Sequence, residues 1–211
     1  MKGFQFFFLI FSSALFSQVQ DSAALISEVQ IDAYRKPTKL LTATKSVSVV
    51  SPNFLSQNAP ERLLVSVNLL PGSKMEERSP GSYRFSIRGS TLRSPFGVRN
   101  VKVYLDDFSL TDASGNTYLN ILDPEILNSI EIYKGPESGD FGAVTGGTAL
   151  LKTKNSEEQN FGISAGSFSH YKGKLHFAKE LKNHFLQVYT SYETTDSYRD
   201  HAALQRKFMF L

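Results

Sequence analysis

The last part of the chain alternates apolar and polar residues, and this pattern constrains the fold more than any other feature. From Asn160 onward one set of alternate positions is apolar: Phe161, Ile163, Ala165, Tyr171, Leu175, Phe177, Leu186, Val188 and Tyr192. The positions between them include Lys172, Lys174, His176, Gln187, Ser191 and Glu193. Successive side chains of a strand point to opposite faces, so the pattern predicts antiparallel strands with one apolar and one polar face. Both transmembrane barrels and soluble sheets with one wet face contain such strands.

The first residues have the features of a secretory signal peptide. Lys2 precedes a mostly apolar run at 4–11, and small residues follow up to Ser17. The run is shorter than the roughly 20 residues that a membrane-spanning helix needs, so we predict a signal peptide at 1–17 rather than a membrane anchor. No later stretch of the sequence is apolar enough to span as a helix, so a membrane role falls to the strands. Together these features indicate the outer membrane.

Composition excludes several classes of function. The 23 lysines and arginines are interspersed with 20 acidic residues, and a net charge of +3 does not indicate a nucleic-acid partner. Cysteine is absent, which rules out a disulfide framework, a thiol nucleophile and a cysteine-bound metal. The histidines, His170, His176, His184 and His201, form no ligand-spaced cluster. We therefore expect no enzyme activity, no metal site and no cofactor.

Residues 42–153 have the pattern of a small α+β domain with long glycine-rich loops. Short strands are expected at 47–50, 85–87, 101–105, 130–133 and 149–152, because these stretches are β-branched or alternate. A small helix should follow Pro52, and another should begin at Pro60. Asp123 is a suitable N-cap for a short helix starting at Pro124. The doublet Asp106–Asp107 predicts a hairpin turn.

Three motifs stand in order within this domain: IRGSTLRSPFG at 87–97, VKVYLDDFSLTDASG at 101–115 and IEIYKGPESGDFGAVTGGTALLKTK at 130–154. Together they resemble the plug domain of TonB-dependent outer-membrane receptors, and the third motif is the strongest match. Asp107, Phe108 and Ser109 stand where the family usually has glycine, an apolar residue and proline, so the form of that turn departs from the family pattern.

The resemblance implies an α+β plug followed by the first antiparallel strands of a transmembrane β-barrel. Barrels of this class have about 22 strands, whereas 154–211 can hold only about three or four strands of roughly 10 residues. We therefore expect a truncated piece of a longer receptor: signal peptide at 1–17, periplasmic arm at 18–41, plug at 42–153 and barrel strands at 154–211.

The glycines of the motifs are expected to be structural, since glycine adopts backbone conformations closed to other residues. They are Gly89, Gly97, Gly135, Gly142, Gly146 and Gly147. A phosphate-binding loop is the alternative, but the sequence has neither the Gly-Lys-Ser/Thr motif nor the GxGxxG motif that such loops need.

The resemblance also implies two sets of contact residues. Plug charges would pair with carboxylates on the inner barrel wall, and the candidates are Arg88, Arg93 and Glu131; ordinary surface pairing is the alternative. The periplasmic arm would present an extended segment to the energy-transducing protein TonB by strand addition. The candidates there are Leu25, Glu28, Val29, Gln30 and Ile31, and the alternative is a plain linker.

The function that follows from the resemblance is reception and import of a scarce, large extracellular ligand, most often a ferric siderophore in this family. The expected partners are TonB, outer-membrane lipid and the ligand. A SusC-type glycan importer is an alternative, although only about 25 residues separate signal peptide and plug, too few for its extra N-terminal domain. The other alternative is a secreted plug-like binding module whose tail strands form a soluble sheet.

Overall fold

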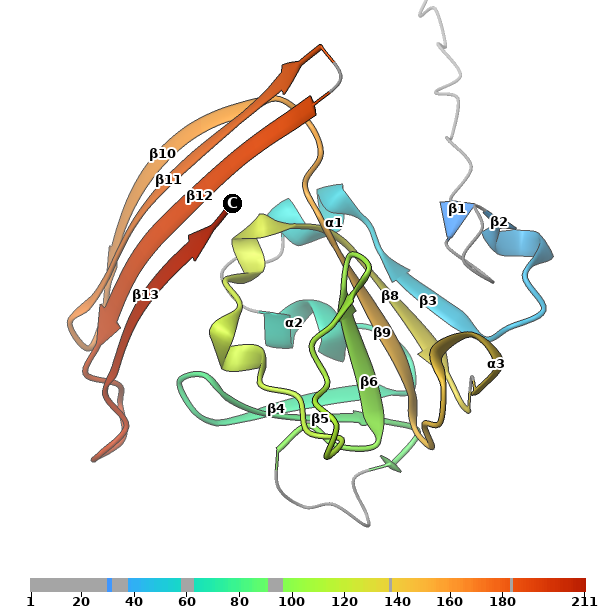
Figure 1. Ribbon diagram of the computed structural model, residues 1–211. Coiled ribbons are helices and arrows are strands. Elements are labelled where there is room, and N and C mark those ends of the chain that lie inside the picture. The colour runs from blue at the N-terminus through green and yellow to red at the C-terminus, as the bar shows by residue number, and fades with distance from the viewer. Residues whose placement is uncertain (1–29, 32–37, 58–62, 91–96, 137, 183) are drawn as a thin grey trace, which may run out of the picture.

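The computed structural model describes residues 30–31, 38–57, 63–90, 97–136, 138–182 and 184–211. We call residues 38–153 the central domain and the four strands within 158–210 the outer sheet. The outer sheet curves along one side of the central domain, on the side opposite β1 and β2 (Figure 1). Among the described residues, no helix has both the length and the apolar character needed to cross a membrane.

A mixed five-stranded sheet forms the core of the central domain. Its spatial order is β3 (Val47–Val50), β8 (Leu127–Lys134), β9 (Gly147–Thr153), β6 (Val101–Leu105) and β7 (Phe108–Ser109). Only the β6–β9 pair is parallel among the neighbours in this sheet. Its core includes the fully buried Ile126, Ile130 and Ile132. The predicted strands at 47–50, 101–105, 130–133 and 149–152 are confirmed, and Asp106–Asp107 forms the turn between β6 and β7.

Two short helices and a separate hairpin pack beside this sheet. They are α1 (Pro52–Gln57), α2 (Leu63–Asn68), β4 (Ser73–Ser79) and β5 (Ser82–Ile87). The helix expected from Pro60 is described from Leu63 onward. Strand β4 was not predicted, because its sequence SKMEERS is mostly polar; its buried apolar side chain is Met75, opposite Phe85 of β5.

Short elements complete the domain, and one of them, β1, precedes it in the chain. They are β1 (Gln30–Ile31), β2 (Thr38–Lys39), η3 (Leu40–Thr42), η5 (Leu119–Ile121), η6 (Pro124–Ile126) and α3 (Ser138–Phe141). The helix predicted after Asp123 is only the single 3-10 turn η6, because strand β8 begins at once at Leu127.

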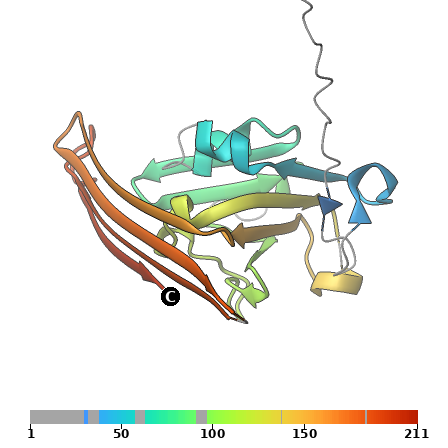
Figure 2. The same ribbon diagram turned by 90° about the horizontal axis from the view of Figure 1, so that it is seen from above.

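The outer sheet is an antiparallel meander. Its strands are β10 (Glu158–Gly166), β11 (His170–Leu181), β12 (His184–Thr195) and β13 (Leu204–Phe210). Residues 182–183 connect β11 to β12, whereas the longer segment 196–203 connects β12 to β13. The four strands pair only with their sequence neighbours and form an open, curved layer (Figure 2).

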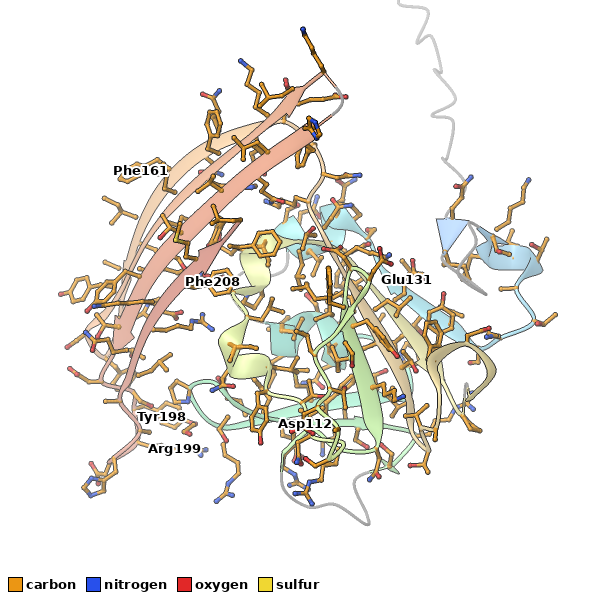
Figure 3. The ribbon with its side chains drawn as sticks, viewed as in Figure 1. Asp112, Glu131, Phe161, Tyr198, Arg199 and Phe208 are labelled. Carbon is orange, nitrogen blue, oxygen red and sulfur yellow. The ribbon has the colours of Figure 1, made fainter. Side chains whose placement is uncertain are left out.

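The two faces of the outer sheet have the predicted alternation. Lys172, His176, Gln187 and Ser191 are buried on the face toward the central domain. Apolar side chains on the opposite face are exposed: Phe161, Ile163, Tyr171, Leu175, Phe177, Leu186 and Tyr192. Figure 3 shows Phe161 directed away from the central domain and Phe208 directed toward it. The polar face of this sheet is therefore the covered one.

Candidate functional site

The outer sheet meets the central domain at the turn 122–126, which the local sequence Asp-Pro-Glu shapes. The Asp123 carboxylate accepts a hydrogen bond from the backbone N–H of Glu125 at 3.2 Å, as an N-cap does. Pro124 fixes the first position of the 3-10 turn, where no N–H is needed. Both acidic side chains then point into the contact with the outer sheet, where Asp123 is completely buried.

Two lysines of β11 meet these acids. Lys172 places Nζ 3.1 Å from the Asp123 carboxylate and 2.7 Å from Glu125 Oε1. Lys174 pairs with the other oxygen of Glu125. Because residues two apart in a strand share a face, the spacing of the lysines brings both to the same side. The Lys172 side chain is only 2% exposed, so a complete ion pair is removed from solvent.

Hydroxyl groups of β12 complete the shell around Asp123. The Tyr189 hydroxyl donates to Asp123 Oδ2 at 3.1 Å, and Ser191 Oγ donates to the same oxygen at 2.6 Å. Burial alone would disfavour the charged carboxylate, but Lys172 and the hydrogen bonds from Ser191 and Glu125 hold the pKa of Asp123 below its ordinary value. Asp123 is therefore a carboxylate at neutral pH.

Strand β13 adds a third tie to the same turn. Arg206 Nη1 donates to the backbone oxygen of Leu122 at 3.1 Å, and Nη2 pairs with Glu193 of β12 at 2.5 Å. Three neighbouring strands thus contact residues 122–125. We call Asp123, Glu125, Lys172, Lys174, Tyr189, Ser191 and Arg206 the anchor cluster. A buried pair of this kind costs desolvation, and removing one partner leaves the other charge unsatisfied.

The predicted plug–wall charges lie elsewhere. Arg88 Nη2 donates to Ser46 Oγ at 3.1 Å, and Glu131 accepts from the Tyr133 hydroxyl at 2.8 Å. Figure 3 places Glu131 on β8, away from the outer sheet. Arg93 lies outside the described residues. Both of these hydrogen bonds stay within the central domain, so the pairing of Arg88 and Glu131 with a barrel wall stays a prediction.

Sequence reasoning identified Asp123 only as an N-cap and did not foresee the anchor cluster. Its charges are arranged opposite to the expectation, with acids on the central domain and lysines on the sheet. The sequence does contain features that fit this cluster. Asp123 and Glu125 flank a proline, and Lys172 and Lys174 alternate on the predicted polar face, but nothing in the sequence set these two segments side by side.

The predicted TonB-contact segment is only partly described. Gln30 and Ile31 form β1, which pairs antiparallel with Thr38 and Lys39 of β2. Gln30 is exposed, whereas Ile31 is 1% exposed. Leu25, Glu28 and Val29 lie outside the described residues. Contact of this segment with TonB stays a prediction.

Two of the six motif glycines are in close backbone contact. A Cβ on Gly147, whose φ is +146°, would lie 2.2 Å from the Tyr133 backbone oxygen. A Cβ on Gly146 would lie 2.6 Å from the Asn100 backbone oxygen. The remaining four, Gly89, Gly97, Gly135 and Gly142, have positive φ. Gly146 and Gly147 lead into β9, where the neighbouring backbone leaves no room for a side chain.

A small cavity of about 190 Å³ lies where the tip of the β4–β5 hairpin meets one end of the outer sheet. Arg199 lies over the Tyr198 ring, 5.0 Å from its centroid, and donates to the Arg78 backbone oxygen at 2.6 Å. The Phe168 and Tyr198 rings are 6.2 Å apart. Tyr198 and Arg199 lie at the end of the sheet in Figure 3. The cavity is thus lined by aromatic rings and by charges of both signs, since Glu77 and Glu193 also line it.

Comparison with known proteins gives one family and one fold. Residues 39–149 match the family described as the TonB-dependent receptor plug domain. The pyoverdine outer-membrane receptor FpvA of Pseudomonas aeruginosa PAO1, bound to pyoverdine, is similar with a TM-score of 0.64, 17% identity and 82% of this chain covered. The alcaligin outer-membrane receptor FauA of Bordetella pertussis has a TM-score of 0.60, 17% identity and 79% coverage. The copper transporter OprC has a TM-score of 0.56 and 17% identity, and the match covers 77% of this chain.

The chain spans 25%, 29% and 26% of the length of these three proteins, respectively. At such identities the likeness concerns the fold: a plug followed by antiparallel strands.

Proposed function

The chain belongs to the family of TonB-dependent receptor plug domains, and on that premise we propose that it is the N-terminal part of an outer-membrane receptor that binds and imports a scarce extracellular ligand. In this proposal the central domain is the plug, and the outer sheet is the first part of the surrounding wall.

The membrane placement rests on one observation. The apolar and polar faces of the outer sheet are reversed relative to those of a sheet in a soluble protein. Its polar face is covered by the plug, while Phe161 and Ile163 on its other face are 70% and 75% exposed. A soluble sheet buries its apolar face and leaves the polar face in water. A transmembrane strand does the reverse, since lipid covers its apolar face. This arrangement favours the receptor over a secreted binding module.

The ligand class follows from weaker support. Two of the similar structures are named for the siderophores pyoverdine and alcaligin, and a third is named as a copper transporter. The small cavity offers aromatic rings together with charges of both signs, among them Arg199 and Glu193, so it does not by itself favour one ligand class. On the basis of the similar structures, we propose a ferric siderophore or similar metal complex as the ligand, and a glycan is the second candidate class.

Import would depend on TonB. The segment from Leu25 to Ile31 is the proposed contact, by addition of an extended strand. Pairing of Gln30 and Ile31 in β1 supports an extended backbone there, and one edge of β1 is already occupied by β2. We propose no catalytic role, and the similar structures are named as receptors and a transporter.

The test is a deletion strain grown under iron limitation. With single purified siderophores as iron sources, the strain should lose growth on at least one of them and regain it when the gene is restored. Loss of growth should be equal in a strain without TonB. If the strain grew normally on every siderophore and failed only on a glycan, the proposed ligand would be a glycan instead.

A further inference from the structure

Basic side chains form a row on the covered face of β11. They stand at every second position: His170, Lys172, Lys174 and His176. Alternate residues of a strand point to the same side, so neighbouring members of the row are roughly 7 Å apart. We call Lys172 and Lys174, which stand in the middle, the inner lysines. The turn 122–126 lies directly against them and is the yellow-green segment of Figure 1 that faces the outer sheet.

The two ends of the row are paired within the outer sheet itself. His170 Nε2 lies 3.1 Å from Glu193 Oε1 of β12, and His176 Nδ1 lies 3.1 Å from Glu158 Oε2 of β10. The inner lysines differ, because across the described residues their ion pairs are with the two acids of the turn 122–126. Movement of that turn would therefore leave the ends of the row paired and the middle unpaired.

At the positions opposite the inner lysines, the neighbouring strands offer no free carboxylate. Strand β11 lies between β10 and β12, so its neighbours on both sides belong to the described sheet. Four residues stand directly opposite the inner lysines: Gly162, Ser164, Ser191 and Glu193. The acid among these four is Glu193, and Arg206 at 2.5 Å and His170 already hold its carboxylate. Once the turn moved away, the inner lysines and Arg206 would share this one carboxylate, and the uncovered site would carry net positive charge.

Asp123 and Glu125, which we call the plug acids, occupy the inner lysines in the way that a bound anion would. Lys172 Nζ lies between them, 3.1 Å from the Asp123 carboxylate and 2.7 Å from Glu125 Oε1. Ser191 Oγ donates a further hydrogen bond to Asp123 at 2.6 Å. Two ammonium groups and a hydroxyl form strong, charge-assisted hydrogen bonds with carboxylates. Buried ion pairs add little stability relative to apolar residues, so stability alone does not account for these charges.

We propose that the inner lysines are a binding site for the imported ligand, and that the plug acids occupy this site until the plug moves. The ligand is then an anion with at least two carboxylate groups, because it has to replace two carboxylates. The inference rests on the receptor function proposed above and narrows its ligand to an anionic chelate. In the closed arrangement the site is inaccessible, since the Lys172 side chain is only 2% exposed.

The first test asks whether the site accepts a free carboxylate. Glu125→Ala removes a group of the size of acetate, and it should lower the unfolding temperature of the detergent-solubilised protein. Added acetate should restore most of that loss, whereas acetamide, which has the same shape without the charge, should not. When Lys172→Gln and Lys174→Gln are added to Glu125→Ala, acetate should have no effect. Failure of acetate to restore stability, or equal restoration without the inner lysines, overturns the inference.

The second test measures import by cells of radiolabelled ferric chelates. Ferric citrate and other carboxylate chelates are compared with ferrichrome, an uncharged hydroxamate chelate. Deletion of the gene should abolish uptake of at least one carboxylate chelate and leave uptake of ferrichrome unchanged. Loss of ferrichrome uptake with every carboxylate chelate unaffected overturns the inference alone. No loss on any chelate overturns the receptor proposal, and the inference with it.

A paired substitution separates ligand binding from a structural role. Glu125→Gln combined with Lys174→Gln in the chromosomal gene keeps a neutral hydrogen-bonded contact, so a purely structural cluster would still function. This pair should lower uptake of the carboxylate chelate about tenfold, the effect of losing one charge-assisted hydrogen bond. The matched control is His176→Gln combined with Glu158→Gln, a pair within the outer sheet, and its uptake should equal wild type. Equal uptake in the two paired variants overturns the inference and leaves the receptor proposal intact.

Discussion

At the scale of single residues, Asp123 is the centre of the contact between plug and sheet. It accepts hydrogen bonds from Tyr189, Ser191 and the Glu125 N–H, and it pairs with the buried Lys172. Replacing it with alanine leaves the lysine buried beside Glu125 alone. We expect Asp123→Ala to destabilise the protein by about 3 kcal/mol or more, as when one partner of a buried pair is removed.

Thermal unfolding of the detergent-solubilised protein measures this loss. The control is Glu76→Ala, which removes solvent-accessible pairs with Lys74 and Arg84 and should lower the melting temperature much less than Asp123→Ala does. Equal effects of the two substitutions would contradict the central role of Asp123.

The same carboxylate predicts a dependence on pH. Its folded pKa lies below its ordinary value, so the unfolded state binds the proton more readily. The stability from Asp123 is therefore complete above its unfolded pKa of about 4 and is lost as pH falls through the lower folded pKa. Between neutral pH and about pH 5 the difference in stability between wild type and Asp123→Asn should stay constant, and it should shrink in more acidic solution. A difference that shrinks already near pH 7 would contradict this.

Gly147 offers a test of backbone packing. Its φ of +146° is unfavourable for other residues, and a Cβ would lie 2.2 Å from the Tyr133 oxygen. We expect Gly147→Ala to separate β9 from β8 and to remove the protease-resistant core of the plug. Gly173→Ala is the control, since its Cβ meets open space. Resistance of Gly147→Ala equal to wild type would contradict the requirement for glycine.

At the scale of elements, Asp106 joins the end of β9 to the β6–β7 hairpin. Its carboxylate accepts from the Thr153 N–H and from the Thr153 hydroxyl, both at 2.9 Å. This fixes the end of the plug sheet just before the chain leaves for the outer sheet. Asp106→Ala should cost about 2 kcal/mol, because hydrogen bonds to a charged group are lost. Asp107→Ala, at the exposed neighbouring position, should be neutral in the same unfolding measurement.

The elements also show how far sequence reasoning reaches. Alternation from Phe161 to Tyr192 correctly predicted the two faces of the outer sheet, because period and burial act locally. Strand β4 was not predicted. Its polar sequence does not indicate a strand, and it becomes one because it pairs with β5. The anchor cluster escaped for a related reason. Asp123 and Lys172 are brought together only by the fold, and alternation says nothing about which segment covers a polar face.

At the scale of the whole molecule, the outward-facing apolar side of the outer sheet predicts that a charge is harmful on this face and tolerated on the other. Ile163 of β10 is 75% exposed on the apolar face, whereas Asn160 lies on the other face opposite His176. Ile163→Lys would place an ammonium against lipid, which costs up to about 2–4 kcal/mol, depending on its depth in the membrane. Asn160→Lys would place it on the polar face near Glu158, whose carboxylate already accepts from Asn160.

We therefore expect Ile163→Lys to reduce the amount of protein recovered in urea-washed outer membranes by more than tenfold, while Asn160→Lys leaves the recovery unchanged. A secreted module would respond differently, because water would solvate a lysine at residue 163 at little cost and the protein would stay in the soluble fraction. Equal recovery of both variants in the soluble fraction would contradict the receptor proposal and favour the secreted binding module. Since the polar face would then touch only the plug, the anchor cluster would remain a structural contact within a soluble protein.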